Sequence, residues 1–473
     1  MATDNQRHVF FPASGRYNGT TLENRGTNGN YWSASFNDST NAYNLNFNSS
    51  NVNPQNNNNR YRGLTVRPVQ HSPEATERNT IEDSMAYTLT REALLLDLHA
   101  AFQSAKRKKA GKPYVRVFEK NLDANINSLA DDLINRTYQP EPSSCFVVQR
   151  PKKREVFAAQ FRDRVVHHLY FNYTHKLFER TFIADTYSCI EGRGTHYGID
   201  RLKKHIRQES RNWQRDCYVM KLDIRGYFMH IDRQRLMEIA TGTLRKMAEI
   251  VDGMDVDFLL WLTEQIVMLD PKTSCKIIGT AKEWEGLDKN KSLFHTPDGC
   301  GLPIGNLTSQ LFSNVYLNEL DQYCKRTLGC KHYGRYVDDA YIVSCDRDWL
   351  LSLVPQIRDF LKDRLHLELH MGKTQVIDVR LGVEFLGAYI LPYRTYISNE
   401  SLRRMMEQME GMGNVSKESM YHSVNSWLGV LSHYDSFNIR CELFMKTRFL
   451  RYGTFDRDMT VYELSKPVTA MCA

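Results

Sequence analysis

Two adjacent carboxylates between apolar residues constrain this chain more than any other feature of its sequence. The stretch HYGRYVDDAYIVSC, residues 332–345, predicts two short strands around a tight turn at Asp338 and Asp339. Two acids at the tip of an apolar hairpin repel each other and lose hydration. Aspartate is also common in solvated turns, so the pair alone fits a structural role as well as a chemical one.

A third carboxylate favours the chemical role. Asp223 ends an apolar strand predicted by CYVMKLDIRGYF, residues 217–228. Two strand-end carboxylates that meet in space can hold a pair of Mg²⁺ ions, because Mg²⁺ prefers hard oxygen ligands. Such ions activate an attacking hydroxyl and stabilise the leaving phosphate oxygens. The pattern therefore indicates phosphoryl or nucleotidyl transfer.

Helical and extended segments are mixed without a regular βαβ repeat, which favours an α+β fold. The run VEFLGAYIL, residues 383–391, predicts one strand, and residues 354–369 begin as a helix and end as a strand. From about residue 396 the chain is mostly helical again. Helical spacing of apolar residues also covers residues 84–112, 117–135, 255–269 and 307–328.

The first 84 residues differ in composition from the rest. Residues 1–60 hold 16 asparagines, whereas residues 61–473 hold only 15. Residues 1–84 carry equal numbers of acids and bases, so the whole net charge of +7 belongs to residues 85–473. A basic body is typical of a protein with a polyanionic partner. We place a polar linker at residues 71–84.

The cysteines and the apolar runs indicate the cellular location of the protein. The ten cysteines form no CxxC pair, which indicates reduced thiols in the cytoplasm. No apolar run reaches membrane-spanning length, and the first residues lack the layout of a signal peptide. We therefore expect a cytoplasmic protein without a membrane partner.

The sequence resembles a reverse transcriptase in several blocks that follow one another in the expected order. The block YVDD, preceded by DIRGYF and GLPIGNLTSQ, is similar to the polymerase palm, and the resemblance covers roughly residues 85–395. It implies a right-hand polymerase with fingers at 85–215, a palm at 216–395 with a fingers-like insertion at about 240–300, and a short helical thumb at 396–473. Residues 1–84 would be an Asn-rich segment, either disordered or not native to the enzyme.

The same resemblance assigns roles to individual residues. Asp223, Asp338 and Asp339 match the catalytic and metal-binding aspartates of an enzyme that uses two Mg²⁺ ions, with Mn²⁺ as an alternative. Lys373 matches a general acid near the pyrophosphate, and a plain surface lysine is its rival. Phe228 falls at the position where a bulky ring excludes a ribose 2′-hydroxyl. The remaining nucleotide-binding candidates are Lys152, Lys153, Arg154, Arg162, Ile304, Gly305 and Gln310, of which Arg162 would lie over the templating base.

Primer and template contacts are expected at two places. Arg193 lies in YSCIEGRGT, which resembles the block before the palm, and Phe385, Leu386 and Gly387 lie in VEFLGAYI, which resembles a primer-grip strand. In the thumb, Trp427, Leu428, Leu431 and Phe437 are expected to line the core. Arg440, Lys446, Arg448 and Arg451 are expected to face duplex phosphates.

One block indicates which kind of reverse transcriptase the sequence resembles. Ile304-Gly305 and Ser309-Gln310 resemble the reverse transcriptases of diversity-generating retroelements, within the group II intron-like bacterial and phage family. This implies copying of a template-repeat RNA into cDNA with errors at adenines, using a primer, dNTPs and a small basic accessory protein. Isoleucine has no polar atom to fix the incoming nucleotide, which suits low fidelity. A non-mutagenic defence-type or group II intron-like reverse transcriptase is the alternative.

The N-terminal segment has three interpretations. Its runs GNYWSASF, residues 29–36, and GLTVRPV, residues 63–69, resemble the end of a C-type-lectin-like domain. It is a fused binding module, a disordered polar segment, or the translated template repeat of the element, with Met85 as the start of the enzyme. We favour the third, because asparagine codons begin with two adenines.

Overall fold

The computed structural model describes residues 89–465, except 150–151, 252, 274 and 413–414, together with five strands between residues 16 and 59. The chain divides into two units, Met1–Ser84 and Met85–Ala473. In the first unit, β1 (Arg16–Asn18) pairs with β2 (Thr21–Glu23). A second sheet has the order β3-β4-β5, formed by Gly29–Phe36, Asn41–Phe47 and Val52–Asn59, so the asparagine run lies in a strand.

The second unit begins with helices that pack around one long buried helix. The fingers region contains α2 (Arg91–Lys106), α3 (Pro113–Lys120), α4 (Leu122–Ile134), β6 (Ser143–Val148), β7 (Arg154–Ala158) and α5 (Phe161–Glu179). Residues 117–135 were expected to form one helix, which is wrong: the chain breaks at Asn121, whose φ of −123° is not helical. Asparagine is a good residue for such a break, because it caps helices better than it extends them.

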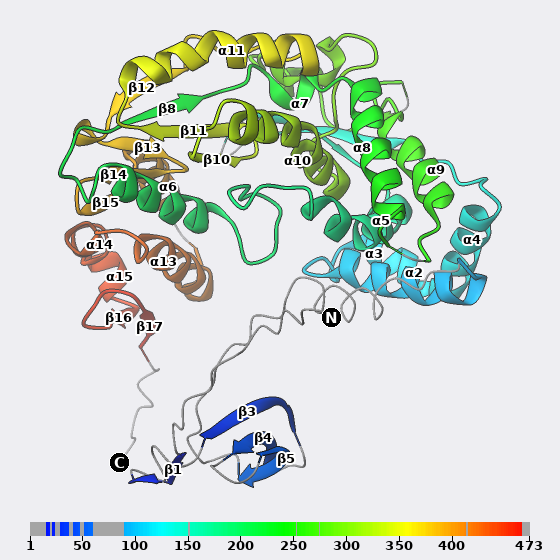
Figure 1. The fold of residues 1–473 in the computed structure, drawn as a ribbon. Helices are drawn as coiled ribbons and strands as arrows, with labels where there is room; N and C mark the ends of the chain where they lie inside the picture. Colours follow the sequence, from blue (N-terminus) through cyan, green and yellow to red (C-terminus); the bar gives the residue numbers. More distant parts are fainter. Residues whose placement is uncertain are drawn as a thin grey trace, which may run out of the picture. The chain divides into compact units, whose positions relative to one another are not determined.

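A four-stranded antiparallel sheet forms the palm. Its order is β10-β11-β8-β12, formed by His332–Tyr336, Asp339–Ser344, Tyr218–Leu222 and Gln375–Asp378. The helix α6 (Thr195–Glu209) covers one face, where Ile199 and Leu202 join a core with Val219 and Tyr341. The helix α11 (Arg347–Leu365) lies on the opposite side (Figure 1). It packs against α10 (Leu307–Gln322), because Tyr316 donates to the Leu365 carbonyl at 2.6 Å.

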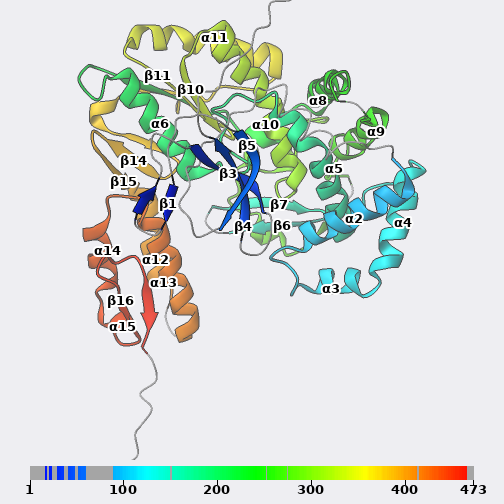
Figure 2. The same cartoon turned by 60° about the horizontal axis from the view of Figure 1, so that its bottom comes forward.

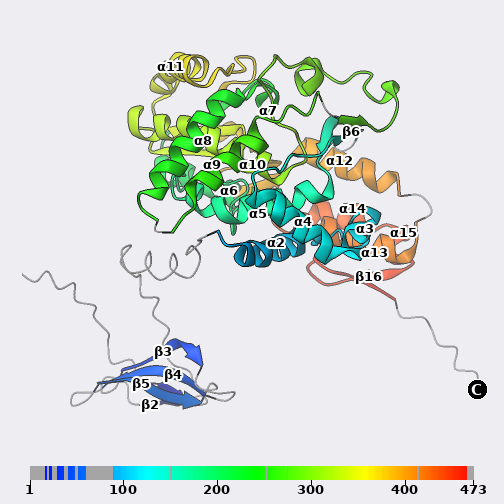
Figure 3. The same ribbon diagram turned by 90° about the vertical axis from the view of Figure 1, so that its right-hand side faces the viewer.

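The segment that the sequence predicts as an insertion packs on the first helices and the first sheet of this unit. Its helices α8 (Arg233–Ala248) and α9 (Val256–Val267) pack side by side near α5 and α10 (Figure 3). The strand β9 (Cys275–Ile277) pairs in parallel with β6, so the fingers sheet has the order β7-β6-β9. Shorter helices are α7 (Tyr227–His230), the 3₁₀ turns Ala281–Glu283, Lys289–Lys291, Leu293–His295 and Val379–Leu381, and the π-helix Tyr323–Thr327.

A small sheet follows the palm and corrects two predictions. Residues 383–391 form a hairpin rather than one strand: β13 (Val383–Phe385) and β14 (Ala388–Leu391) are joined by Leu386 and Gly387, and β15 (Arg394–Ile397) follows. Both turn residues have positive φ, at 49° and 83°, as a tight two-residue hairpin requires. Residues 366–369 are not a strand either, since His366 ends α11 at φ 51° and only Leu369 forms a bridge, with Ile224.

The C-terminal part, where the sequence predicts a helical thumb, is mostly helical and ends in a small hairpin. It contains α12 (Asn399–Glu410), α13 (Lys417–Leu431), α14 (Phe437–Phe444), α15 (Thr447–Leu450), β16 (Gly453–Phe455) and β17 (Tyr462–Leu464). It lies across the palm from the fingers helices α2–α4 (Figure 2). Leu428 and Leu431 are buried as predicted and Trp427 packs against them, but Phe437 is 49% exposed. Arg440 is buried and donates to the Met459 carbonyl, so it does not face a duplex.

Candidate active site

The carboxylates converge at one edge of the palm sheet. Asp223 follows the last residue of β8, and Leu222 in β8 pairs with Ala340 in β11. Asp339 is the first residue of β11 and pairs with Tyr336, so the tight turn contains Val337 and Asp338 rather than the two aspartates. The antiparallel register therefore brings Asp223 beside Asp338 and Asp339, as the sequence predicted for strand-end acids.

These acids act on one another electrostatically. Burial, together with the nearby charges of Asp339 and Asp223, raises the pKa of Asp338 to about 6. The pKa of Asp339 is also raised, first by burial, while Lys221 and other cations work against the rise. Carboxylates crowded in this way are stabilised in their charged form by a bound cation.

Lys373 supplies one such cation from the protein itself. Its Nζ lies 2.8 Å from Asp223 Oδ2, although its side chain is 62% exposed. The loop that carries it is fixed to the same strand end, because the His370 N–H donates to the Asp223 carbonyl at 2.8 Å and the Lys373 N–H donates to the His370 carbonyl. Lys373 thus lies at the carboxylates.

The residues fit Mg²⁺ in the manner of a phosphate-transfer site. Within the described ranges, no three His, Cys, Asp or Glu side chains stand close enough to enclose a metal ion by themselves. Mg²⁺ in such sites is bound through one or two carboxylates together with waters and substrate phosphates. Asp223 and Asp338 provide such a pair, and their mutual repulsion fits a site that a cation completes.

Phe228 and Ile304 pack against the same apolar cluster. This cluster consists of Cys145, Phe157, Met229 and Leu293, and both side chains are partly buried on it. The backbone ties the segments together, since the Leu302 N–H donates to the Phe228 carbonyl at 2.8 Å and the Phe157 N–H to the Ile304 carbonyl at 3.0 Å. Two residues 76 positions apart in the sequence therefore pack on one apolar cluster.

Gly305 and Gln310 follow in the same segment. Gly305 has φ of 126°, and a Cβ there would come within 2.9 Å of the Val156 side chain, so only glycine fits the close approach to β7. Gln310 lies in the first turn of α10 with an exposed side chain that accepts a hydrogen bond from Cys189 Sγ at 3.5 Å.

The basic fingers residues separate into two groups. Lys152 lowers the pKa of Asp339 and Arg154, the first residue of β7, lowers that of Asp338, so both lie near the carboxylates. Lys153 instead donates to the Glu285 carbonyl at 2.5 Å, which directs it toward the insertion. Lys152 and Arg154 therefore add positive charge near the carboxylates.

Arg162 is occupied within the fingers. Its Nη2 lies 2.5 Å from Asp132 Oδ2, and its guanidinium lies 5.1 Å from the centre of the Tyr138 ring. Arg162 also lies 3.7 Å from the buried carboxylate of Asp163. These contacts join α5 to α4, and a place of Arg162 over the templating base stays a prediction.

The proposed primer and template contacts are only partly at the surface. Arg193 donates to the Thr186 carbonyl at 2.8 Å and is half-buried. Phe385 is only 2% exposed and its ring lies against that of Tyr341, so it belongs to the palm core. Leu386 and Gly387 form the hairpin turn, and the Gly387 carbonyl accepts from the Ser398 N–H at the start of the thumb.

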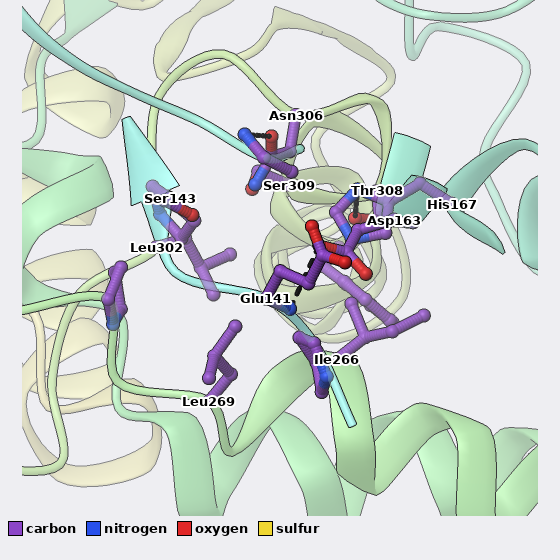
Figure 4. A pocket seen from close by; sticks show the side chains of 15 residues that line it. Glu141, Ser143, Asp163, His167, Ile266, Leu269, Leu302, Asn306, Thr308 and Ser309 are labelled. Atoms are coloured by element: carbon purple, nitrogen blue, oxygen red, sulfur yellow. Dashed lines mark hydrogen bonds between the residues drawn. The ribbon is translucent and has the colours of Figure 1, made fainter. Parts of the chain in front are cut away.

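A small pocket lies at the junction of fingers and palm (Figure 4). Asp163, His167 and Thr308 line it, and none of Asp223, Asp338 and Asp339 does. Burial raises the pKa of Asp163 to about 6 and lowers that of His167 to about 4. Asp163 accepts hydrogen bonds from the Tyr138 hydroxyl and the Glu141 N–H, so its carboxylate serves to hold the fingers together.

Sequence reasoning missed a buried polar network beneath the catalytic turn, formed by Ser188, Asn314, Asp321 and Arg335. A signal for it exists in the sequence. Arg335 is a charged residue inside the apolar strand HYGRY, and a buried arginine needs an acid. Asn314 and Asp321 are seven residues apart on α10, so they lie on one face of that helix.

Comparison with known proteins supports the arrangement. Residues 152–390, about half of the chain, match the family described as Reverse transcriptase (RNA-dependent DNA polymerase), and residues 1–69 match a domain of unknown function. Protein YkfC of Escherichia coli K12 is 24% identical over 313 residues, which cover 59% of this chain and 74% of YkfC. No helix among the described residues is long and apolar enough to cross a membrane.

Solved structures of telomerase show a weaker likeness. Candida albicans telomerase with a fragment of telomeric RNA has a TM-score of 0.42 and 10% identity, over 67% of this chain and 54% of that one. Candida tropicalis apo telomerase has a TM-score of 0.41 and 11% identity, over 69% of this chain and 65% of that one. This chain thus spans less than two thirds of the telomerase chains. The sequence match across the palm carries the assignment: the chain belongs to the reverse transcriptase family of RNA-dependent DNA polymerases.

Proposed function

We propose that this protein extends the 3′ hydroxyl of a primer with deoxynucleotides, copying an RNA template. The observation that carries the proposal is the convergence of Asp223 and Asp338 at adjacent strand ends of a palm sheet. Bound Mg²⁺ would activate the 3′ hydroxyl of the primer and neutralise charge on the phosphates. Asp223 and Asp338 would hold the ions, and Asp339 would add negative charge beside them.

The other side chains act on the nucleotide. Lys152 and Arg154 are placed to bind the triphosphate through fixed positive charge. The Phe228 ring would exclude a ribose 2′-hydroxyl, and Lys373 would protonate the departing pyrophosphate. The partners are therefore a template RNA, a primer, the growing cDNA and dNTPs.

The test is incorporation of labelled dNTPs onto a DNA primer annealed to RNA, by the purified full chain with Mg²⁺. Template-directed extension is expected. Absence of extension with every primer and template combination would contradict the proposal.

We further propose that copying is error-prone at template adenines, as in diversity-generating retroelements. The support is the resemblance of the block at residues 301–310, together with the position of Ile304 on the same cluster as Phe228, where it offers no hydrogen bond. A small basic accessory protein remains a prediction, to be checked by purifying the native protein from its host.

Ile304→Gln tests the fidelity proposal. Glutamine adds a donor and an acceptor beside the nucleotide site, so misincorporation opposite adenine should fall, by about tenfold for one hydrogen bond. Ile277→Gln, on the exposed β9 strand, makes the same change elsewhere and should leave the error rate unchanged. Sequencing of cDNA measures both. An unchanged error rate in Ile304→Gln would remove this residue from the account, and faithful copying by the wild type would favour a non-mutagenic enzyme.

The translated template repeat remains our proposal for residues 1–84. Its support is the asparagine count together with the lectin-like runs. The genome should then contain a near-copy of the DNA for this segment that differs mainly at adenines. A genome without such a copy would leave a fused module as the better interpretation.

A further inference from the structure

The residue before Asp338 has a strained backbone. Val337 has φ of 56°, in the left-handed region, where a β-branched side chain is rare. Both of its polar backbone groups are held by side chains: its N–H donates to Ser188 Oγ at 3.2 Å, and its carbonyl accepts from Arg335 Nη1 at 2.8 Å. Such a conformation persists only when its surroundings enforce it.

The two residues that hold Val337 are joined to each other through Asn314. Its Oδ1 accepts from Ser188 Oγ at 3.0 Å and from Arg335 Nη1 at 3.2 Å. Its Nδ2 donates to the Ser188 carbonyl at 2.7 Å. Ser188 and Asn314 are 2% and 1% exposed, so water does not compete for these bonds.

Asp321 anchors the arrangement from below. Its two carboxylate oxygens accept from Arg335 Nε at 2.7 Å and Nη2 at 2.6 Å, and both residues are fully buried. The hydroxyls of Tyr333 and Thr186 also donate to Asp321, so its remaining acceptor sites are filled. A bidentate pair fixes the plane of the guanidinium, and hence the direction of Nη1 toward the turn.

We propose that Ser188, Asn314 and Arg335, here called the Val337 clamp, hold Val337 in its left-handed conformation and thereby position Asp338 for catalysis. These are positioning residues, and the proposal rests on the polymerase function proposed above. The physical reason is that Asp338 follows Val337 directly, so any relaxation of the Val337 backbone would swing the Asp338 carboxylate away from Asp223. A displacement of about 1 Å in such a group can lower a rate by about a hundredfold.

Ser188→Ala is the first test, because it removes only the hydroxyl that accepts from the Val337 N–H. The turnover rate of single-nucleotide incorporation should fall about 10- to 100-fold, while the Kd for primer–template stays within about threefold. Ser436→Ala is the matched control: this thumb serine is also 2% exposed, and its hydroxyl donates to the Leu431 carbonyl, far along the chain from the turn. Its turnover should be unaffected.

The same substitution in the Val337→Gly variant distinguishes a loss of positioning from a general destabilisation of the palm. Glycine adopts positive φ about as readily as negative φ. In Val337→Gly the left-handed conformation is therefore no longer strained, and it depends less on the Val337 clamp. Ser188→Ala should therefore lower turnover by less than about threefold when it is added to Val337→Gly. Equal losses in the two backgrounds would overturn the proposal.

A readout independent of catalysis completes the design. Amide hydrogen exchange should be slow at Val337 in the wild type and in Ser436→Ala, and at least tenfold faster in Ser188→Ala. Unchanged exchange at Val337 would overturn the clamp even if activity fell. If the wild type incorporates no nucleotide, the polymerase function fails, whereas the exchange measurement still decides whether the clamp holds Val337.

Discussion

Two neighbouring rings, those of Tyr227 and Phe228, have different surroundings. The Phe228 ring lies 5.4 Å from that of Tyr227, and it packs on the cluster that also supports Ile304. Tyr227 is buried and donates to the Ser313 carbonyl, so it is fixed in the core. Phe228 is only partly buried, which leaves it as the ring of the two that can meet a substrate.

Phe228→Val therefore carries a prediction. The smaller side chain should admit ribonucleotides, raising the ratio of rNTP to dNTP incorporation by about tenfold or more, as expected for the relief of a steric clash. Competition between the two nucleotide types in the primer-extension assay measures this ratio. Val267→Ala, in a buried position on α9, is a control for loss of core volume. A ratio that stays constant in Phe228→Val would contradict its assignment as the selective residue.

At this scale the sequence predicted the acids and missed their support. Asp223, Asp338 and Asp339 stand where apolar runs end, and a local pattern is enough to find them. The contacts of Arg162, Lys153 and Phe385 within the protein could not be predicted, because an ion pair with Asp132 or a place in the core depends on residues distant in sequence. The partners of Arg335 are likewise contributed by α10 and by the segment at Ser188.

Among the elements, α5 places several ionisable groups in the interior. Burial lowers the pKa of both His167 and His168 to about 4 and raises that of Asp163 to about 6. The histidines take up protons in the unfolded chain near pH 6.5 but resist them when folded, so their contribution to stability is lost as the pH falls from 6.5 toward 4. The raised pKa of Asp163 has the opposite effect, because the folded protein binds its proton more readily than the unfolded chain does. Its gain in stability at low pH offsets the loss from about one of the two histidines.

The unfolding free energy should accordingly fall between pH 7 and pH 5. His167→Gln removes one of these groups and should make the fall smaller by about 2 kcal/mol, the value expected for a histidine shifted from 6.5 to about 4. Chemical denaturation at several pH values measures the slope. His422→Gln, an exposed change on α13, should keep the wild-type slope. Identical slopes for wild type and His167→Gln would contradict the buried neutral histidine.

The ends of helices and strands could be predicted where the sequence contains recognisable turn residues. The prediction failed where it does not. The hairpin at Leu386 and Gly387 lies within VEFLGAYIL, where an apolar residue adopts positive φ, so the run reads as one strand. The break between α3 and α4 at Asn121 falls within a continuous helical pattern of apolar residues. In both places the apolar periodicity continues through the turn residues, so it does not show where one element ends.

At the scale of the whole molecule, the basic charge and the polymerase-like elements belong to the same part of the chain. The basic excess belongs to residues 85–473, and the palm, fingers and thumb elements all lie in that unit. The mixed α+β class followed from the order of helical and extended segments. The joining of β9 to the fingers sheet did not, because a parallel pairing between residues 143–145 and 275–277 leaves no local signal.

The proposed function depends on nucleotidyl transfer at Asp223 and Asp338. The most direct measurement is single-nucleotide incorporation by Asp338→Asn, which removes the negative charge and keeps nearly the same shape. We predict a loss of about a thousandfold or more, equivalent to about 4 kcal/mol of transition-state stabilisation, with an unchanged circular dichroism spectrum. Asp348→Asn, an exposed acid in the first turn of α11, should retain full activity. Activity of Asp338→Asn within tenfold of the wild type would contradict the account.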